Sequence, residues 1–383
     1  MSHRMILNQT AYLGRGAIDN IADEVTGRGF TKVLVVTDKG LVSAGIVDRV
    51  LAVLDRAQLD YEIYDDVTPN PTIAAVQGGV AAFQEARAEA IIAVGGGSPV
   101  DTAKAIGIII TNPEFADVRS LEGVAPTKYP AAPIIAVATT AGTAAEVTIN
   151  YVITDVENKR KFVCVDPHDI PVVAVVDPDL MDAMPVALRV ATGMDALTHA
   201  IEGYTTAGAW ALTDVLHLAA IEMIAKALPE AARGEAAGVE QMALAQYVAG
   251  MGFSNVGLGI VHAMAHPLGA FYDTPHGIAN AVLLPTVMAF NAEYTGEKYR
   301  RIAAAFGVRD AADIPLARAR EAAVGAVREL VRLLEVPPRL RDIGVREEDI
   351  PALADAAFAD VCAGGNPRPA SRDQLEELYR SIY

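Results

Sequence analysis

Hydrophobic runs alternate with amphipathic segments through the first half of the chain. Runs such as Lys32–Asp38 and Ala90–Val94 are short, continuous and rich in β-branched residues, as buried strands are. The segments between them place apolar residues at the three-to-four-residue spacing of helices. This alternation predicts a mostly parallel sheet covered by helices. The expected elements are strands at 32–38, 61–64, 90–94 and 133–139, and helices at 46–59, 72–88 and 101–111.

The pattern changes in the middle of the chain. Two β-rich runs, Tyr151–Thr154 and Phe162–Val165, flank a polar segment and predict a hairpin. Beyond residue 185 the strands stop, and long segments with helical periodicity continue almost to the last residue. We therefore predict two domains, a Rossmann-like α/β domain at residues 1–184 and an all-α domain at residues 185–383.

The composition narrows the class of protein. Of the 383 residues 52% are hydrophobic, which is enough for more than one core. A formal net charge of −17 argues against a nucleic acid or an anionic membrane surface as a partner. The two cysteines, Cys164 and Cys362, are too few for a disulfide framework and favour the cytoplasm. The first residues lack the apolar core of a signal peptide, so we expect no export.

One uncharged stretch, Gln241–Tyr272, has the length of a membrane span. Glycines, histidines and a proline interrupt it, whereas a helix facing lipid is more continuously aliphatic. We interpret it as helices buried at the centre of a soluble domain. Such helices lack charged residues because burying a charge is costly.

Three glycines follow the strand at 90–94 and open a helix. Such a loop lets backbone N–H groups approach a pyrophosphate, and the helix N-terminus adds partial positive charge. Ser98 is expected as the N-cap, Pro99 at the first helical position and Asp101 as the capping-box acid. Capping explains those three residues but not the glycines Gly95–Gly97, so the motif predicts phosphate binding.

Two further segments are candidates for binding a dinucleotide. Asp38 ends the first strong strand, where a carboxylate can accept from a ribose 2′-OH and repel a 2′-phosphate, which favours NAD over NADP. A plain turn residue is the alternative, and the usual order of glycines and acid is reversed. The loop Thr139–Thr143 offers hydroxyl donors or is a surface turn. Gly14–Gly16 lacks a third glycine, so we interpret it as a turn.

Four histidines and one aspartate have the spacing of metal ligands. Asp195 and His199 lie four residues apart, as do His262 and His266, and His276 follows. Residues four apart share one face of a helix, so either pair could hold an ion such as Zn²⁺ or Fe²⁺. Core histidines are the alternative for any one pair. A mononuclear site commonly uses three or four protein ligands, so we expect that at least one of these five residues does not bind the metal.

At these motifs the chain resembles the iron-containing (group III) alcohol dehydrogenase family over essentially its whole length. The resemblance implies a dehydroquinate synthase-like architecture, in which an NAD-binding α/β domain and an all-helical metal domain flank the active site. It implies NAD-linked interconversion of a short-chain aldehyde and a primary alcohol or diol. The blocks that carry it are Gly95–Asp101, Thr139–Thr143, Gly193–Glu202 and His262–Gly277.

The resemblance also implies roles for single residues. It places Fe²⁺, with Zn²⁺ as the alternative, on Asp195, His199, His262 and His276. His266 becomes a proton-relay or nicotinamide-contacting group. Asn150 and Cys362 are implied at the substrate. The implied dinucleotide contacts are Asp38, Asn70, Gly97, Ser98, Thr139, Thr140, Thr143, Val152, Lys161, Leu180 and, near the nicotinamide, Phe253. Asp273 stands where Asn is expected in the most similar members of the family, which weakens the implied substrate assignment.

Other functions are set against this one. Dehydroquinate synthases and glycerol-1-phosphate dehydrogenases share the architecture but act on anionic substrates, and residues 193–202 and 241–272 contain no Lys or Arg to bind such a substrate. A small neutral alcohol or aldehyde is favoured, with a broader alcohol or 1,3-propanediol specificity left open. A non-catalytic role conflicts with the intact ligand positions. The resemblance implies a homodimer joined partly through an N-terminal strand at Met5–Ala11.

Overall fold

The computed structural model of the chain describes residues 2–158 and 160–383. They form two compact units, Met1–Ala183 and Met184–Tyr383. The first unit holds a six-stranded sheet and a two-stranded hairpin, and the regular elements of the second are all helices. The predicted fold class, an α/β region followed by an all-α region, is confirmed.

Neighbouring strands of the main sheet are all parallel. Every residue of the central strands β4 and β5 is buried, because helices cover both faces, and this produced the continuous apolar runs in the sequence. The strand order is β1-β8-β5-β4-β2-β3, with β1 (Thr10–Leu13), β2 (Lys32–Val36), β3 (Asp60–Tyr64), β4 (Ala90–Gly95), β5 (Ile134–Ala138) and β8 (Val173–Val176).

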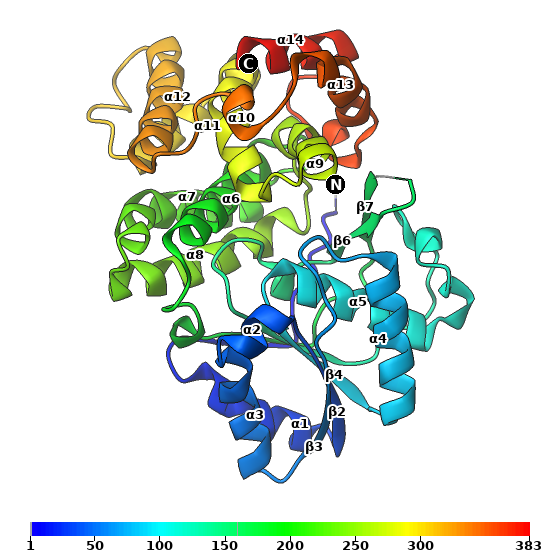
Figure 1. Cartoon of the computed structure of the whole chain (residues 1–383). Helices are drawn as coiled ribbons and strands as arrows, with labels where there is room; N and C mark the ends of the chain where they lie inside the picture. Colours follow the sequence, from blue (N-terminus) through cyan, green and yellow to red (C-terminus); the bar gives the residue numbers. More distant parts are fainter. Residues whose placement is uncertain (1, 159) are drawn as a thin grey trace. The chain divides into compact units, whose positions relative to one another are not determined.

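Two helical layers enclose the sheet (Figure 1). Alternate residues of β2 enter separate cores, Val33 and Val35 on one face and Leu34 and Val36 on the other. The first core packs against α1 (Ile21–Gly27) and α3 (Ile46–Arg56), and the second against α4 (Ile73–Ala86) and α5 (Gly97–Thr111). A short helix, α2 (Lys39–Ser43), follows β2.

The start of α5 differs from the prediction. Its N-cap is Gly96 and its first residue is Gly97, so Ser98 is not the cap and Pro99 is not at the first position. Asp101 is not a capping-box acid either, since its Oδ2 accepts from the N–H of Val152 at 3.0 Å. The helix begins directly where β4 ends, and only glycine backbone spans that turn.

The N-terminal strand is also shorter than expected. β1 begins at Thr10, so it overlaps the expected segment Met5–Ala11 only at its end. Gly14–Gly16 is a turn as predicted, with both glycines at positive φ.

The hairpin prediction is confirmed. β6 (Asn150–Asp155) pairs antiparallel with β7 (Arg160–Val165). Its turn contains Lys159, which lies outside the described residues. Arg119 donates to Asp155 at 2.7 Å and, with Asn158, holds the pKa of that carboxyl below its usual range, although burial opposes this.

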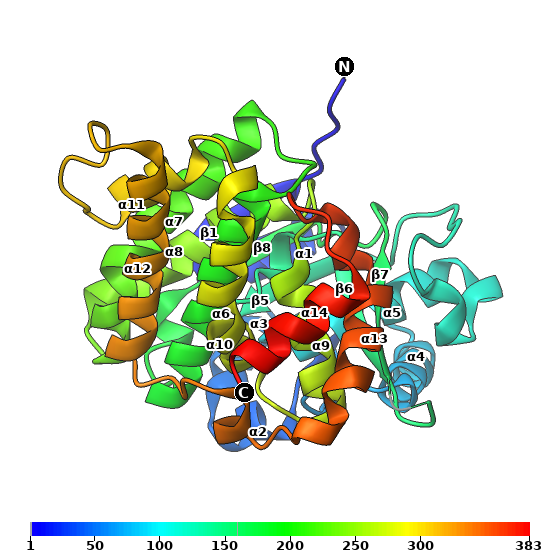
Figure 2. The same cartoon turned by 90° about the horizontal axis from the view of Figure 1, so that it is seen from above.

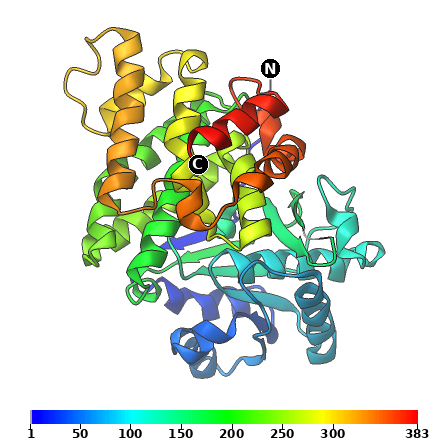
Figure 3. The same cartoon turned by 45° about the horizontal axis from the view of Figure 1, so that its top comes forward.

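The second unit is a bundle of helices. α6 packs against α7, α8 and α10, and α9 packs against α10 and α13. Figure 2 shows α11 beside α12, and Figure 3 shows α14 against α13. The bounds are α6 (Val186–Thr205), α7 (Ala211–Ala232), α8 (Ala236–Phe253), α9 (Ile260–Tyr272), α10 (His276–Asn291), α11 (Lys298–Ala305), α12 (Leu316–Leu333), α13 (Ile350–Ala359) and α14 (Arg372–Ser381).

The uncharged stretch at 241–272 is divided between α8 and α9, and most of its residues are buried. Among the described residues, no helix has both the length and the apolar character needed to cross a membrane.

His217 lies in the core of this bundle, on α7. Its side chain is fully buried, and neither ring nitrogen has a hydrogen-bond partner among the described residues. Gly203 and Gly252 make room for the ring, because a Cβ at either position would lie 2.3 Å from Nε2. Burial, followed by the charge of Lys298, lowers the pKa of His217 to about 3.

This burial predicts a loss of stability in acid. Below about pH 6.5 the unfolded chain protonates His217, whereas the folded chain keeps it neutral down to about pH 3. Between those values the free energy of unfolding therefore falls by up to about 1.4 kcal/mol for each unit by which the pH is lowered. We expect His217→Phe, which keeps a flat ring, to unfold with a correspondingly smaller change in thermal midpoint between pH 6.5 and 5. The exposed control His3→Phe should retain the wild-type dependence, and identical dependence in all three proteins would contradict the account.

Candidate metal centre and dinucleotide loops

α6 presents three ionisable side chains along one buried face. Asp195, His199 and Glu202 follow one another at spacings of four and three residues, which places them in one stripe. Their exposed fractions are 3%, 6% and 4%. Polar groups buried to this extent are stable only with partners, and the partners come from α9 and α10.

The polar atoms of four predicted ligands lie close together. Asp195 Oδ1 is 3.8 Å from His262 Nε2, 3.5 Å from His276 Nε2 and 4.0 Å from His199 Nε2. Ligand atoms about 2.0–2.1 Å from a tetrahedral ion stand roughly 3.4 Å apart, so small side-chain shifts would close this set on an ion. Three imidazole nitrogens and one carboxylate suit Fe²⁺ or Zn²⁺.

Asn280, one turn after His276 on α10, shows where the ligand atoms converge. Its Nδ2 donates to Asp195 Oδ1 at 2.8 Å and lies 3.3 Å from the Nε2 atoms of both His262 and His276. Its Oδ1 is buried and has no hydrogen-bond partner among the described residues. One donor can reach three acceptors only because they face a single point, which is the arrangement that a cation requires.

The electrostatics of this cluster favour positive charge. Burial lowers the pKa of His262, but the carboxylates of Asp195 and Glu202 beside its ring outweigh burial and raise it to about 9. Burial would raise the pKa of Asp195, yet His199, His276 and His262 hold it below its usual range. The buried carboxylates therefore create a site that holds a proton or a metal cation on its nitrogens.

His266 does not join this group. Its Nδ1 lies 2.7 Å from Asp360 Oδ2, and its ring stacks on that of His276 with centroids 5.4 Å apart. The N–H of Cys362 donates to the other oxygen of Asp360. Despite burial, the bond to His266 lowers the pKa of Asp360, whereas burial and then Asp360 raise that of the Cys362 thiol.

These three residues are close enough to hold an ion, with one ligand atom from each within 4.8 Å of the others. The Nδ1 of His266 and the N–H of Cys362 contact the two oxygens of Asp360, so the three residues hold one another in place. The contact with Asp360 orients the imidazole of His266.

Phe253, at the end of α8, contacts one of the candidate metal ligands, His199. Its ring stacks on that of His199 with centroids 4.1 Å apart and an interplanar angle of 10°. The stacking fixes the plane of the His199 imidazole.

In the first unit, the two polar loops approach each other closely. A Cβ at Gly96 would lie 3.0 Å from Thr140 Oγ1, and one at Gly97 would lie 3.2 Å from Thr143 Cγ2. Gly96, the N-cap of α5, has no side chain that could accept from the first-turn N–H groups. The Thr139 hydroxyl is buried and has no hydrogen-bond partner among the described residues. These donors suit a pyrophosphate.

Other predicted dinucleotide residues have partners of their own. Asp38 caps α2 through a bond from the N–H of Leu41 to its Oδ1, which leaves Oδ2 for a ribose hydroxyl. Lys161 donates to Asn70 at 2.7 Å, and Asn70 has φ 59°. Leu180 is buried at the end of this unit, in the turn after β8.

A buried charged cluster ties α5 to β6. Lys104 Nζ donates to the carbonyls of Thr148 and Asn150 at 2.6 and 2.9 Å, and Asp169 lies 3.9 Å away. Burial lowers the pKa of Lys104 despite its acidic neighbours. Burial also raises the pKa of Asp101 to about 7, against the effects of Lys104 and the Val152 N–H. The cluster holds the start of the hairpin, with Asn150 and Val152, against α5.

Sequence reasoning missed three residues, two in the candidate metal cluster and one beside it. Glu202 follows His199 by three residues and Asn280 follows His276 by four, so helical spacing could have identified both. Asp360 is separated from His266 by 94 residues and gave no local signal.

Comparison with known proteins places this geometry in a family. Residues 8–178 match the family model for iron-containing alcohol dehydrogenase, and residues 189–383 match that for the C-terminal part of the same family. The chain belongs to the iron-containing alcohol dehydrogenase family. Its predicted activity class, an oxidoreductase acting on aldehydes or alcohols, is confirmed, as are iron and NAD as the cofactors of this family.

Relatives are similar over their whole lengths. The chain is 63% identical to a lactaldehyde reductase of Escherichia coli strain K12 over 383 residues, which are 100% of both chains. The crystal structure of a 1,3-propanediol oxidoreductase superposes with a TM-score of 0.97 at 40% identity and covers 100% of both chains. A sulfoacetaldehyde reductase of Bifidobacterium kashiwanohense in complex with NAD⁺ has a TM-score of 0.87 at 27% identity, and the alignment covers 100% of this chain and 99% of that one.

Proposed function

We propose that this enzyme reduces lactaldehyde to 1,2-propanediol with NADH. The observation that carries the proposal is the 63% identity to a lactaldehyde reductase over the whole of both chains. The 1,3-propanediol oxidoreductase, at 40% identity, supports a broader alcohol specificity less strongly. In the reaction a hydride passes from C4 of NADH to the carbonyl carbon, and a proton is added to the oxygen.

The second unit is the proposed metal-binding and catalytic domain. Asp195, His199, His262 and His276 would hold Fe²⁺, with Zn²⁺ as the alternative, and the distances from Asp195 Oδ1 to the three imidazoles support this set. Held by these four side chains, the ion would supply Lewis-acid chemistry at the substrate oxygen. Asp195 supplies the negative charge, and Phe253 keeps the His199 imidazole in its plane.

The first unit is the proposed dinucleotide-binding domain. Its glycine loop and the free hydroxyl of Thr139 support a pyrophosphate subsite, and Asp38 supports NAD over NADP. Backbone donors suit a chain with a net charge of −17, because they bind phosphate without a basic surface. The proposed contacts are Asp38, Asn70, Gly97, Ser98, Thr139, Thr140, Thr143, Val152, Lys161 and Leu180, with Phe253 from the second unit.

His266 is the proposed proton relay. Because Nδ1 is bonded to Asp360, its proton stays there and Nε2 remains free to give or take one. Asn150 and Cys362 are proposed substrate contacts. The amide of Asn150 does not ionise, and the raised pKa of the Cys362 thiol keeps it protonated at pH 7. Two uncharged side chains suit an uncharged aldehyde.

We also propose a homodimer that works in the cytoplasm. β1 is an edge strand of the main sheet, so one side of it is available to a second copy. The exposed side chain of Leu13 supports this surface as an interface. Two unbridged cysteines fit a reducing compartment.

Activity measurements test the proposed reaction. We expect protein purified without oxygen to contain about one iron per subunit and to consume NADH fastest with L-lactaldehyde among short aldehydes. Glycolaldehyde, acetaldehyde and 3-hydroxypropanal are the comparison substrates. The absence of NADH consumption with all of them would refute the proposal, and a preference for 3-hydroxypropanal would favour the 1,3-propanediol alternative.

Two histidine variants test the division between ligand and relay. His262→Ala should lose most of its iron, because it removes an atom at the centre of the cluster. His266→Ala should keep the metal but lower kcat by about 100-fold or more, since positioned proton transfer contributes at least that much. Metal analysis and steady-state rates distinguish the two. Equal loss of metal in both variants would show that His266 is also a ligand.

One charge-neutralising variant tests the choice of dinucleotide. Asp38→Asn keeps an N-cap for α2 but removes the charge that would repel a 2′-phosphate. We expect the ratio of kcat/KM for NADPH to that for NADH to rise about tenfold, which corresponds to roughly 1.4 kcal/mol. Asp66→Asn, a neighbouring exposed carboxylate, is the control and should leave the ratio unchanged. An unchanged ratio in Asp38→Asn would assign that residue to capping alone.

A further inference from the structure

The first turn of α9 is capped by a side chain from another helix. Glu202 on α6 accepts from the N–H of Val261 at 2.7 Å and from that of His262 at 3.3 Å. The N-cap residue Gly259 has no side chain, and a Cβ there would lie 2.8 Å from Glu202 Oε1. The glycine therefore gives the carboxylate access to the helix N-terminus, where a negative charge is favourable.

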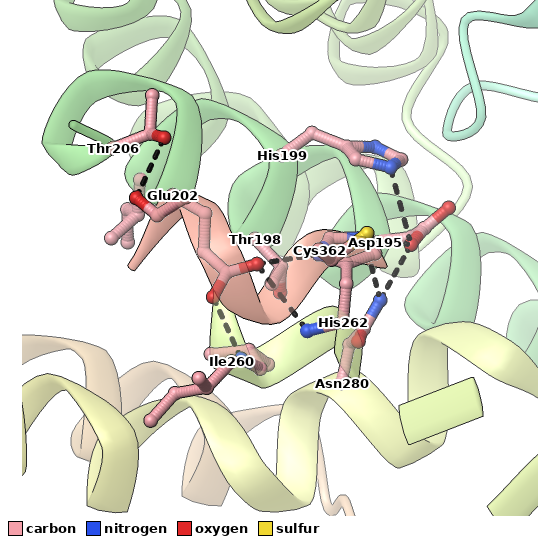
Figure 4. Close-up of polar contacts among 12 residues, drawn as sticks. Asp195, Thr198, His199, Glu202, Thr206, Ile260, His262, Asn280 and Cys362 are labelled. Atoms are coloured by element: carbon pink, nitrogen blue, oxygen red, sulfur yellow. Dashed lines mark hydrogen bonds and ion pairs between the residues drawn. The ribbon is translucent and has the colours of Figure 1, made fainter. Parts of the chain in front are cut away.

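The same carboxylate also holds the imidazole of His262. Glu202 Oε2 lies 2.7 Å from His262 Nδ1, and Figure 4 shows the side chain placed between His262 and the start of α9. A carboxylate accepts hydrogen bonds, so the proton of a neutral His262 resides on Nδ1. The lone pair is then on Nε2, the atom that faces Asp195 Oδ1.

Through these contacts Glu202 on α6 supports His262 on α9. The carboxylate lies seven residues beyond Asp195 on the same stripe of α6, so one helix supplies a ligand and the support for a ligand of another helix. It fixes the tautomer of His262, the plane of its ring and the backbone position from which the ring extends.

We propose that Glu202 is a positioning residue that sets the affinity of the enzyme for its metal ion through His262. This inference rests on the proposed metal site at Asp195, His199, His262 and His276. In Glu202→Gln, the amide must either direct its NH₂ at Nδ1, which favours the tautomer with a proton on Nε2, or direct it at the N–H of Val261. Both arrangements weaken the site.

The experiment measures Co²⁺ binding to metal-free protein by competition with a chromophoric chelator, together with the visible spectrum of the bound Co²⁺. We expect Glu202→Gln to weaken binding by about 10- to 100-fold, the range typical of lost outer-shell partners, and to alter the spectrum. Glu202→Asp, which keeps the charge but is shorter, should restore part of the affinity. It also replaces the Gln variant in the comparison if that variant does not fold.

Asn366→Ser is the matched control. Asn366 Oδ1 accepts from the N–H of Ile260, so it caps the same helix, and its amide pairs with that of Asn291 rather than with the ring of His262. This variant should lower the thermal midpoint of the metal-free protein and leave Co²⁺ affinity within about threefold of wild type.

Two results would overturn the inference. They are unchanged Co²⁺ affinity in both Glu202 variants and equal weakening by Asn366→Ser, which would make the role of Glu202 merely structural. Failure of the wild-type protein to bind one Co²⁺ per subunit would instead refute the proposed metal site.

Discussion

Burial of charge on α6 is the constraint from which the arrangement of the second unit follows. A carboxylate in a helical core is costly unless hydrogen bonds and opposite charge surround it, and α6 buries two, Asp195 and Glu202. Their partners are histidines of α9 and α10 and the backbone N–H groups that begin α9. The packing of these helices is thus tied to the chemistry of the site, because the same contacts satisfy the charges and orient the ligand atoms.

The two units handle charge by different means. The second concentrates carboxylates and imidazoles, which suits a cation, while the first offers a glycine-capped helix start and the buried hydroxyl of Thr139, which suit an anion. The buried Lys104 instead donates to the carbonyls of Thr148 and Asn150 and so serves the packing of the hairpin against α5. A strongly acidic chain can therefore bind a dinucleotide without a basic surface.

The strands, helices and several candidate site residues could be predicted from the sequence where a local rule applied. Apolar runs identified the strands because the parallel sheet is buried on both faces, and helical spacing identified Asp195 with His199. Local rules failed where the chain folds back on itself. Spacing alone paired His262 with His266, but the structure pairs His266 with the distant Asp360 and brings His276 to Asp195 across a loop. The helix start at Gly97 was also misjudged, because capping preferences assume that a side chain is available at the cap, and here the strand ends directly in glycine.

The central claim is that Asp195, His199, His262 and His276 form one metal site supported by Glu202. Anomalous diffraction at the iron absorption edge, from crystals of the iron-loaded enzyme, tests it most directly. The account predicts one strong peak per subunit, within about 2.0–2.3 Å of one atom from each of the four residues. A peak on His266, Asp360 and Cys362, or a peak coordinated by both His262 and His266, would contradict it.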